Sequence, residues 1–559
     1  MIYKILIRKI IHMGMVCLCA ASVLLLLSCG KKAAAGAASG DPDYPINISV
    51  FSMSNMQQPP KDNKIYKWIE DNLHVTFTWD ILVGEKDQKI GVMIAGGDYP
   101  DILHVDSPKF YEAGSLIPLD DLIEKYAPRI KQHYAEAWEK MKEEDGHVYT
   151  LPVWGVYEGK DWSAWYGDSA MWIQKEVLRE FGYPKVATLD EYFDILSKYK
   201  EKYPTINGMP TIPFTILTYD WHDFCLINPP NFLGGFSNDG NGTVDPVTHE
   251  YKVFLYQDIS KRWFKKLNEV NARGLIDRSC FVDNYDQYLS KIASGRVLSF
   301  HDQAWQFQSG ESSLASQEMY NRTYLPLPIV FDESIQPRYR NRKIPNIGQG
   351  IGISVKAKDP VRIIRFLEAQ MSDDAQKITG SWGILGEDYQ LDENGVPYRT
   401  QVQRDQQADE VWKLHNQAAL WWSHNPKIEG SFSDGNPSSI ADLFHEREAT
   451  LRPEDTEVWA AYDVENNAEM MDKDPPANPV WFPMWQVSPL DGSEAQLAWQ
   501  RAQSVYRKYL PQIILAAPAQ FERLWAEYVS ELGKVGLREY EAFFQDAVNK
   551  RIEKWSPKN

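Results

Sequence analysis

The sequence predicts an α/β fold of at least two lobes, followed by a mainly helical C-terminal part. Its 559 residues are too many for one hydrophobic core. Between residues 46 and 105 the apolar pattern changes repeatedly between the strand period and the helix period, which indicates alternating strands and helices. From residue 495 onward the apolar residues follow helical spacing.

Three short strands are predicted at the start of the body. Residues 46–50 and 73–79 alternate apolar and polar side chains, and residues 101–105 follow the chain break GGDYP at 96–100. Between these strands, residues 65–73 and 85–95 carry apolar side chains at helical spacing and are predicted helices. Strands joined by helices pair in parallel, and ligands of such sheets bind beyond the carboxyl ends of the strands.

Polar side chains follow the three predicted strand ends. Asn55, Asp80 and Asp106 stand there, and carboxylates and amides can bond to ligand hydroxyl groups. The alternative is that each of them caps the turn after its strand. We keep all three as candidate ligand-binding residues.

Further elements follow along the chain. Thr188 with Glu191 forms a capping box that predicts a helix start, and residues 297–300 and 351–355 are predicted strands. Helices are predicted over residues 361–371, 495–510 and 521–532. The sequence contains no internal repeat.

Composition excludes some partners and permits others. The chain has 59 basic and 77 acidic residues, a net charge of −18, which repels phosphate backbones, so no nucleic-acid partner is expected. Aromatic residues make up 13% of the chain. Such rings can fill cores, and they can also stack on sugar rings, so the composition permits a carbohydrate-binding protein.

The N-terminus reads as an export signal. Lys4, Arg8 and Lys9 precede a long apolar run that ends in LLLLS at 24–28 and Cys29. This pattern predicts a signal peptide over residues 1–28, with a membrane-spanning anchor as the alternative. Residues 26–29 (LLSC) resemble a bacterial lipobox, so Cys29 is expected to be lipidated, and residues 29–45 are expected to form a flexible tether.

The sequence predicts neither a metal site nor a cofactor. It has no HExxH, CxxC, Walker loop or GxSxG, and the acidic loops at 238–242 and 392–395 lack the twelve-residue calcium pattern, so tight turns are the default there. Cys225 and Cys280 remain after signal removal; a disulfide between them and two buried thiols are both possible.

Several segments together resemble one family, the extracellular solute-binding lipoproteins of bacterial ABC transporters that handle oligosaccharides. They are residues 97–102 (GDYPDI), 114–123 (GSLIPLDDLI), 145–152 (DGHVYTLP), 171–204, 294–297 (SGRV), 301–305 (HDQAW), 382–389 (WGILGEDY), 392–395 (DENG) and 521–549. Each segment alone is weakly specific for the family. Their order and their spread over the mature chain make the combination more specific.

The resemblance implies a two-lobed fold of the periplasmic-binding-protein-like class II, with hinge crossings and a ligand cleft between the lobes. By this analogy residues 46–158 and 345–400 form the first lobe, and residues 159–344 and 401–559 form the second. The family captures an oligosaccharide outside the cell and delivers it to a membrane permease. A lipid-anchored monomer without catalytic residues at the extracellular face of the cell membrane is therefore expected.

Candidate ring-stacking residues lie in aromatic segments that are also polar. The segment 154–166 combines aromatic residues with Gly, Lys and Asp, which favours a cleft over a core, and the resemblance puts a hinge crossing there. The resemblance also suggests ligand contact near the segment 301–305. The candidates are Trp154, Tyr157, Trp162, Trp221, His222, Asp302, Trp305 and Trp382. Packing is the expected role of Trp421, Trp422, Trp499 and Trp525.

Two other functions remain open at this point. One is a lipid-anchored glycoside hydrolase that uses two carboxylates, although 77 acidic residues make any pair uninformative. The other is a mostly helical surface glycan-binding lipoprotein, which the early strand-helix pattern disfavours.

Overall fold

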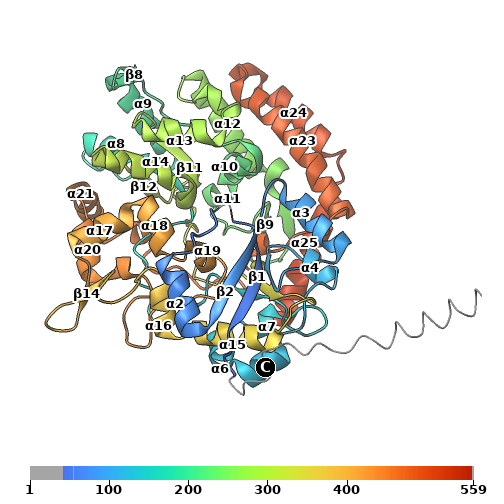
Figure 1. The fold of residues 1–559 in the computed structure, drawn as a ribbon. Helices are drawn as coiled ribbons and strands as arrows, with labels where there is room; N and C mark the ends of the chain where they lie inside the picture. Colours follow the sequence, from blue (N-terminus) through green and yellow to red (C-terminus); the bar gives the residue numbers. More distant parts are fainter. Residues whose placement is uncertain (1–41, 55, 557–559) are drawn as a thin grey trace, which may run out of the picture.

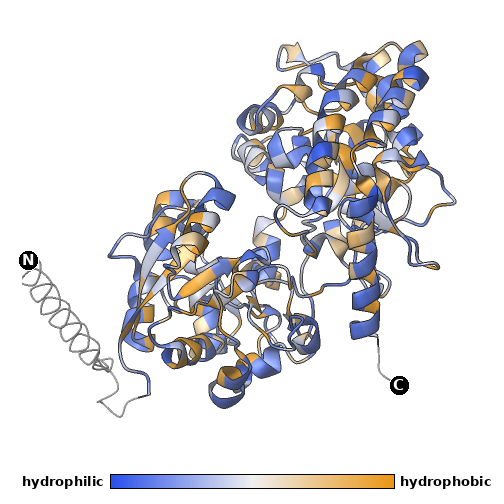
Figure 2. Ribbon diagram, turned by 90° about the vertical axis from the view of Figure 1, so that its right-hand side faces the viewer, coloured by the Kyte–Doolittle hydropathy of each residue, from blue (hydrophilic) through white to orange (hydrophobic). Residues whose placement is uncertain are grey.

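The computed structural model describes residues 42–54 and 56–556, and its two larger sheets have separate cores. Figure 2 shows the chain divided into two bodies. We call the part around the first sheet the first body and the part around the second sheet the second body. Of the sequence-based expectations, those on residues 1–41, including Cys29, and on Asn55 lie outside the described residues.

The first sheet has the order β2-β1-β3-β13-β4. Its strands are β1 (Ile46–Ser52), β2 (Val75–Ile81), β3 (Ile102–Val105), β4 (Leu151–Pro152) and β13 (Gly350–Ile353). β1 pairs in parallel with β2 and β3, whereas β13 runs antiparallel to β3 and β4. The connecting helices are α2 (Lys64–Leu73) and α3 (Lys86–Gly96), so the predicted strand-helix order is confirmed (Figure 1).

The remaining elements of the first body are short. Its other helices are α4 (Lys109–Glu112), α5 (Asp120–Tyr126), α6 (Pro128–His133), α7 (Trp138–Met141), α15 (Pro360–Gln370), α16 (Asp373–Thr379), α17 (Gln401–Ala408), α18 (Glu410–Asn416), α19 (Ala419–Trp422) and α20 (Phe444–Thr450). Two-residue strands pair as β5 (Tyr157–Glu158) with β16 (Glu429–Gly430) and β14 (Gln390–Leu391) with β15 (Pro397–Tyr398).

The second sheet is antiparallel, in the order β11-β6-β12. Its strands are β6 (Ser169–Gln174), β11 (Ser299–Gln303) and β12 (Tyr324–Leu327). Strand β11 begins two residues later than predicted and continues through Gln303, so Asp302 lies inside the strand and not after it. Because of this shift, the Asp302 carboxylate is buried in the core.

Helices make up most of the second body. They include α8 (Lys175–Glu180), α9 (Leu189–Lys202), α10 (Phe224–Ile227), α11 (Pro229–Leu233), α12 (Asp258–Ala272), α13 (Tyr285–Ala293), α14 (Ala304–Ser316), α21 (Pro453–Ala461), α22 (Asn467–Met471), α23 (Glu494–Leu515), α24 (Phe521–Leu532) and α25 (Leu537–Trp555). Helix α9 opens with the predicted capping box, in which Glu191 N donates to Thr188 Oγ1 and the Glu191 carboxylate accepts from Thr188 N.

Smaller elements connect the helices of the two bodies. They are β7 (Thr205–Ile206) paired with β8 (Met209–Pro210), β9 (Gly242–Val244) paired with β10 (Tyr251–Val253), and the single 3₁₀ turns η1 (Asp220–Asp223), η2 (Phe254–Tyr256), η3 (Arg278–Phe281), η4 (Tyr320–Arg322), η5 (Ile440–Asp442), η6 (Met484–Gln486) and η7 (Pro518–Gln520).

The packing of residues 418–443 differs from the division expected from the sequence, which assigned everything after residue 400 to the second lobe. Trp421, Phe432 and Leu443 belong to the same hydrophobic cluster as β1 and β3. The Trp421 ring stacks on Phe77 of β2 at a centroid distance of 4.8 Å. Apolar contact with the first sheet therefore keeps this stretch in the first body, and the chain joins the second cluster again at Val458.

Two crossing segments between the bodies touch each other at Gly155. Its φ is +87°, and a Cβ placed on this residue would overlap the Ile344 carbonyl oxygen. Asn346 N donates to Trp154 O at 3.0 Å in the same place. Only glycine combines this backbone conformation with so close an approach.

The last helix, α25, joins the two bodies. Four of its residues, Leu537, Tyr540, Phe544 and Val548, are buried in the second core. Its C-terminal end contacts the first body, where Lys550 pairs with Glu144 at 3.2 Å and Lys554 Nζ donates to Lys142 O. Helix α25 also contacts α7 of the first body directly.

Two smaller findings concern membrane and redox expectations. Among the described helices, none is long and apolar enough to cross a bilayer. Cys225 and Cys280 are both buried free thiols, which is the second of the two alternatives that the sequence left open.

We expect Gly155→Ala to lower the free energy of unfolding by more than about 2 kcal/mol, because a positive φ costs about 1–2 kcal/mol for an alanine and the new methyl group would overlap the Ile344 carbonyl. Gly146 is a matched control, since its φ is +86° but a Cβ added to it would have no neighbour within 4 Å. Urea unfolding of both variants measures the difference; equal losses would contradict the role of the close contact.

Candidate functional site

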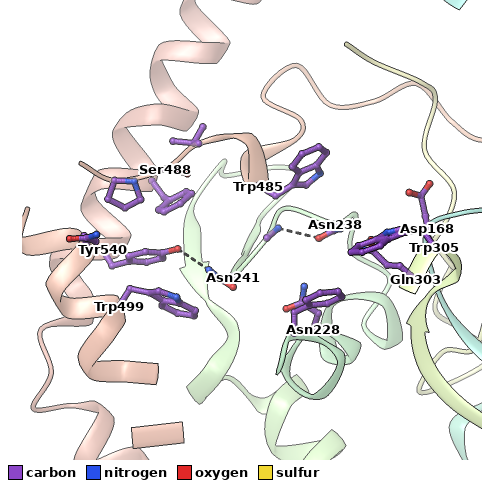
Figure 3. A pocket seen from close by; sticks show the side chains of 16 residues that line it. Asp168, Asn228, Asn238, Asn241, Gln303, Trp305, Trp485, Ser488, Trp499 and Tyr540 are labelled. Atoms are coloured by element: carbon purple, nitrogen blue, oxygen red, sulfur yellow. Dashed lines mark hydrogen bonds between the residues drawn. The ribbon is translucent and has the colours of Figure 1, made fainter. Parts of the chain in front are cut away.

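The second body contains a cavity of about 540 Å³ (Figure 3). It lies where α14, α23 and α25 meet the loops around β9 and η6. The residues around it include Asp168, Asn228, Asn238, Asn241, Gln303, Trp305, Trp485, Gln496, Trp499 and Tyr540. A second cavity of about 150 Å³ shares Asp168, Asn238 and Trp485 with the first and extends to Lys343 and Ile344 on a crossing segment.

Two pairs of aromatic side chains line opposite sides of the larger cavity (Figure 3). Trp499 and Tyr540 stack on each other at a centroid distance of 4.9 Å and an interplanar angle of 23°. Trp305 and Trp485 lie across from them and are 45% and 44% exposed. Flat, partly exposed rings of this kind bind the C–H faces of sugar rings.

Polar side chains lie between the aromatic pairs. Asn241 Nδ2 donates to Tyr540 Oη at 3.0 Å, and Asn238 Oδ1 accepts from Gly240 N at 3.2 Å. Asp168 is exposed and has no hydrogen bond or ion pair with any described residue. Its carboxylate is therefore available to accept from ligand hydroxyl groups, while the amides can both donate and accept.

The predicted residues Trp221 and Trp305 lie next to each other. Their rings are nearly parallel, with an interplanar angle of 13° and a centroid distance of 6.1 Å, and Trp221 is 52% exposed. The predicted residue His222 is buried behind this surface, stacked between Trp221 and Tyr285 at 3.8 and 4.9 Å. Burial lowers the pKa of His222, so it supports the Trp221 ring as a neutral imidazole.

Asp302 does not face the cavity as predicted, because the extended β11 directs it into the core. It is fully buried, and its carboxylate accepts from Tyr288 Oη at 2.6 Å, Gln303 N at 2.7 Å and the Gln306 amide. Burial raises its pKa to about 6. These bonds join β11, α13 and the first turn of α14, so Asp302 positions the helix that carries Trp305.

The two predicted carboxylates of the first body lie near the carboxyl ends of their strands and are paired with lysines of α3. Asp80 accepts from Lys89 at 3.0 Å, and Asp106 accepts from Lys86 at 2.7 Å. The ion pairs place both acids in contact with α3, which follows Asp80 and precedes Asp106 in the chain, and this agrees with a structural role. Ligand contact by either residue stays a prediction.

Of the remaining predicted rings, three lie near the crossings. Trp154 is 40% exposed and packs on Lys427, whereas Trp162 donates from Nε1 to Ser431 Oγ at 2.9 Å. Tyr157 is half-buried in β5, and burial raises its pKa. Ligand contact by these three side chains also stays a prediction.

Trp382 differs from the prediction. It is 1% exposed in the first core, edge-on to Tyr389 at a centroid distance of 5.2 Å. The glycine-rich loop around it turns the indole inward, so this ring fills the core.

Four cavity residues were not identified from the sequence. Trp499 fits an amphipathic stripe and was expected in the core, but it lies at the edge of the core and borders the cavity. Asp168, Trp485 and Tyr540 have no distinguishing spacing. An apolar stripe cannot separate a ring that faces the core from one at the border of a cavity.

No group of three or more His, Cys, Asp or Glu side chains in the described ranges is arranged to hold a metal ion. The acidic loop at 392–395 forms a turn in which Asp392 Oδ1 accepts from Asn394 N and Val396 N, each at 2.8 Å.

The fold is that of two-lobed solute-binding proteins, as predicted. It is similar to an extracellular solute-binding protein from Bifidobacterium longum subsp. infantis, with a TM-score of 0.64 and 17% identity over 91% of this chain and 98% of that one. It is also similar to the alginate-binding protein AlgQ2, with a TM-score of 0.60 and 19% identity over 91% and 98% of the two chains.

Sequence relatives confirm the resemblance to ABC transporter substrate-binding proteins. The chain is 24% identical to the fructooligosaccharide ABC transporter substrate-binding protein FusA of Streptococcus pneumoniae, over 94% of this chain and 95% of FusA. It is 21% identical to lipoprotein LipO of Bacillus subtilis, over 66% of this chain and 72% of LipO. No family model matches the chain.

We expect Asp302→Ala to lower the free energy of unfolding by about 3 kcal/mol, because the Tyr288 hydroxyl and the Gln303 N–H lose their buried acceptor. Asp168→Ala removes an exposed carboxylate without protein partners and should change stability by less than about 0.5 kcal/mol. Chemical denaturation of both variants tests this, and an Asp302→Ala variant as stable as Asp168→Ala would disprove the positioning role.

Proposed function

We propose that this chain captures an oligosaccharide outside the cell and delivers it, chemically unchanged, to the membrane permease of an ABC importer. The observation that carries the proposal is the larger cavity, in which two aromatic pairs face each other across amides and an unpaired carboxylate. Sugar rings present apolar faces and polar edges, and this cavity matches both. The similarity to FusA over nearly the whole chain supports the same function.

The proposal includes a hinged pair of lobes. We assign residues 46–158 and 345–450 to the first lobe and residues 159–344 and 453–556 to the second, with the crossings near Gly155 and Ile344 and between 450 and 453 as hinges. Closing the lobes would bring Trp154 and the strand ends of the first lobe toward the cavity of the second. The ligand-binding set then comprises Asp168, Trp221, Trp305, Trp485, Trp499 and Tyr540, with Trp154 from the first lobe.

Attachment to the cell surface is also part of the proposal. Residues 1–28 act as a signal peptide and Cys29 carries the lipid of a monomeric body at the extracellular face of the membrane. The tether expected over residues 29–45 ends before Asp43, because Arg362 of α15 donates to the backbone carbonyls of Asp43 and Tyr44. Support comes from the lipobox-like LLSC at 26–29 and from the similarity to a protein named as a lipoprotein.

Binding is favoured over hydrolysis by the composition of the cavities. Glycoside hydrolysis uses two carboxyl groups that flank the scissile bond. Among the residues that line the 540 Å³ and 150 Å³ cavities of the candidate site, Asp168 is the single acidic side chain. The parallel strands of the first sheet disfavour the mostly helical glycan-binding alternative.

We expect a bound oligosaccharide to raise the melting temperature, since a ligand at a hundred times its Kd stabilises the folded protein by about 2.7 kcal/mol. Differential scanning fluorimetry with kestose and with glucose, xylose and galacturonate oligomers selects the ligand. Trp305→Ala should remove the shift, because the exposed indole provides the stacking surface while contributing little to the core.

Phe444→Ala is the control, since Phe444 is an exposed aromatic residue that does not line either cavity. Affinity equal to wild type in Trp305→Ala would remove that ring from the site. New reducing ends after incubation of the pure protein with the oligomers would overturn the carrier function in favour of a hydrolase.

A further inference from the structure

Lys427 is a buried cation in the first body that lies between two indole rings. Its Nζ is 3.8 Å from the ring centroid of Trp154 and 4.9 Å from that of Trp422. The residue is 2% exposed. Both distances are within the range in which an ammonium group is attracted to an aromatic face.

No described carboxylate forms an ion pair with this ammonium group. Its hydrogen bonds go to two backbone carbonyls, Val153 O at 3.4 Å and Asn425 O at 3.2 Å. Lysines are rarely buried without a charged partner, because removing the ammonium from water costs several kcal/mol. The indole faces, the two carbonyls and the longer-range attraction of the Glu429 carboxylate therefore provide its stabilisation.

None of the described titratable groups near Lys427 forms an ion pair with its ammonium group, so the charge faces the Trp154 indole. His104 and His424 lie edge to face at 4.6 Å, and burial lowers their pKa values to about 4 and about 3, so both are neutral at physiological pH. Glu429 accepts from Gly155 N, and burial raises its pKa. The charge of Lys343 lowers the pKa of Glu429, and the charge of Lys86 lowers the pKa of His104.

Trp154 belongs to the first crossing segment and keeps 40% of its surface exposed while its ring rests on Lys427. We propose that Lys427 is a positioning residue of the carbohydrate site, whose ammonium group holds the Trp154 indole in the orientation that stacks on a sugar ring. This inference rests on the proposed function, because it takes Trp154 as a ring that contacts the ligand.

A pH dependence follows from the same geometry. Burial lowers the pKa of Lys427 to about 7, so the charge is present below that pH and is lost above it. The contact with Trp154 weakens when the amine becomes neutral. Ligand affinity should therefore fall as the pH rises through about 7, in the opposite direction to a site that needs a deprotonated group.

The test is Lys427→Met, which keeps an unbranched side chain, one atom shorter, and removes its charge. Isothermal titration with the oligosaccharide selected by fluorimetry, at about pH 6 and about pH 8.5, compares this variant with wild type. We expect wild type to bind about tenfold more tightly at the lower pH, and the variant to bind about tenfold more weakly than wild type there and to show no pH dependence.

Lys131→Met is the matched control, because Lys131 of α6 makes a cation–π contact of 3.5 Å with Trp138 and lines neither cavity of the site. Its affinity and pH profile should equal those of wild type. The melting temperature of Lys427→Met should be no lower than that of wild type, since the variant relieves the burial of a charge.

The outcomes separate two failures. If wild type binds an oligosaccharide but Lys427→Met has the same affinity and the same pH profile, the positioning role is refuted while the carrier function stands. If wild type binds no member of the oligosaccharide panel, the proposed function fails and the inference falls with it. An unfolded Lys427→Met would contradict the expected stability, and the pH profile of wild type then decides the positioning role alone.

Discussion

The contact between two crossing segments at Gly155 is the constraint on which the arrangement of the two bodies depends. The backbone of Gly155 lies so close to the Ile344 carbonyl that no side chain fits between them. Because the chain passes between the cores several times, the two bodies cannot separate as independent domains joined by one linker would. The crossings also bring Trp154 and Lys343 to the border between the bodies, so the same constraint that limits their movement also positions side chains near the cavities.

The cavity is built from elements that are far apart in the sequence. Asp168 precedes β6, Trp305 is on α14, Trp485 is in η6, and Tyr540 is on α25. Behind the exposed rings, buried polar groups hold these elements together. Asp302 connects β11, α13 and α14, and Arg507 of α23 pairs at 2.7 Å with Asp223, next to Trp221 and His222. These buried hydrogen bonds and ion pairs fix the orientation of the exposed aromatic rings.

Much of the fold was predictable because it follows from periodicity, whereas the site depends on contacts that periodicity does not contain. The strands and helices between residues 46 and 105 and the capping box at Thr188 were correctly predicted. Trp221 and Trp305, chosen from separate segments as ligand-binding candidates, lie next to each other and are about half exposed, and their ligand contact stays a prediction. Asp302 and Trp382 were misjudged because one more strand residue, or one inward turn of a glycine loop, reverses the side that a residue faces. Trp485 and Tyr540 become neighbours of Trp305 only through tertiary packing.

The last helix, α25, links the wall of the cavity to the first body. Helix α25 contributes Tyr540 to the wall of the cavity, and about four turns further on it ends against α7 of the first body. A stiff rod fixed at one end in the cavity wall converts a small rotation there into a larger displacement at its tip. Because one helix borders the cavity at Tyr540 and contacts α7 of the first body, a displacement of the cavity wall at α25 would also shift the boundary between the two bodies.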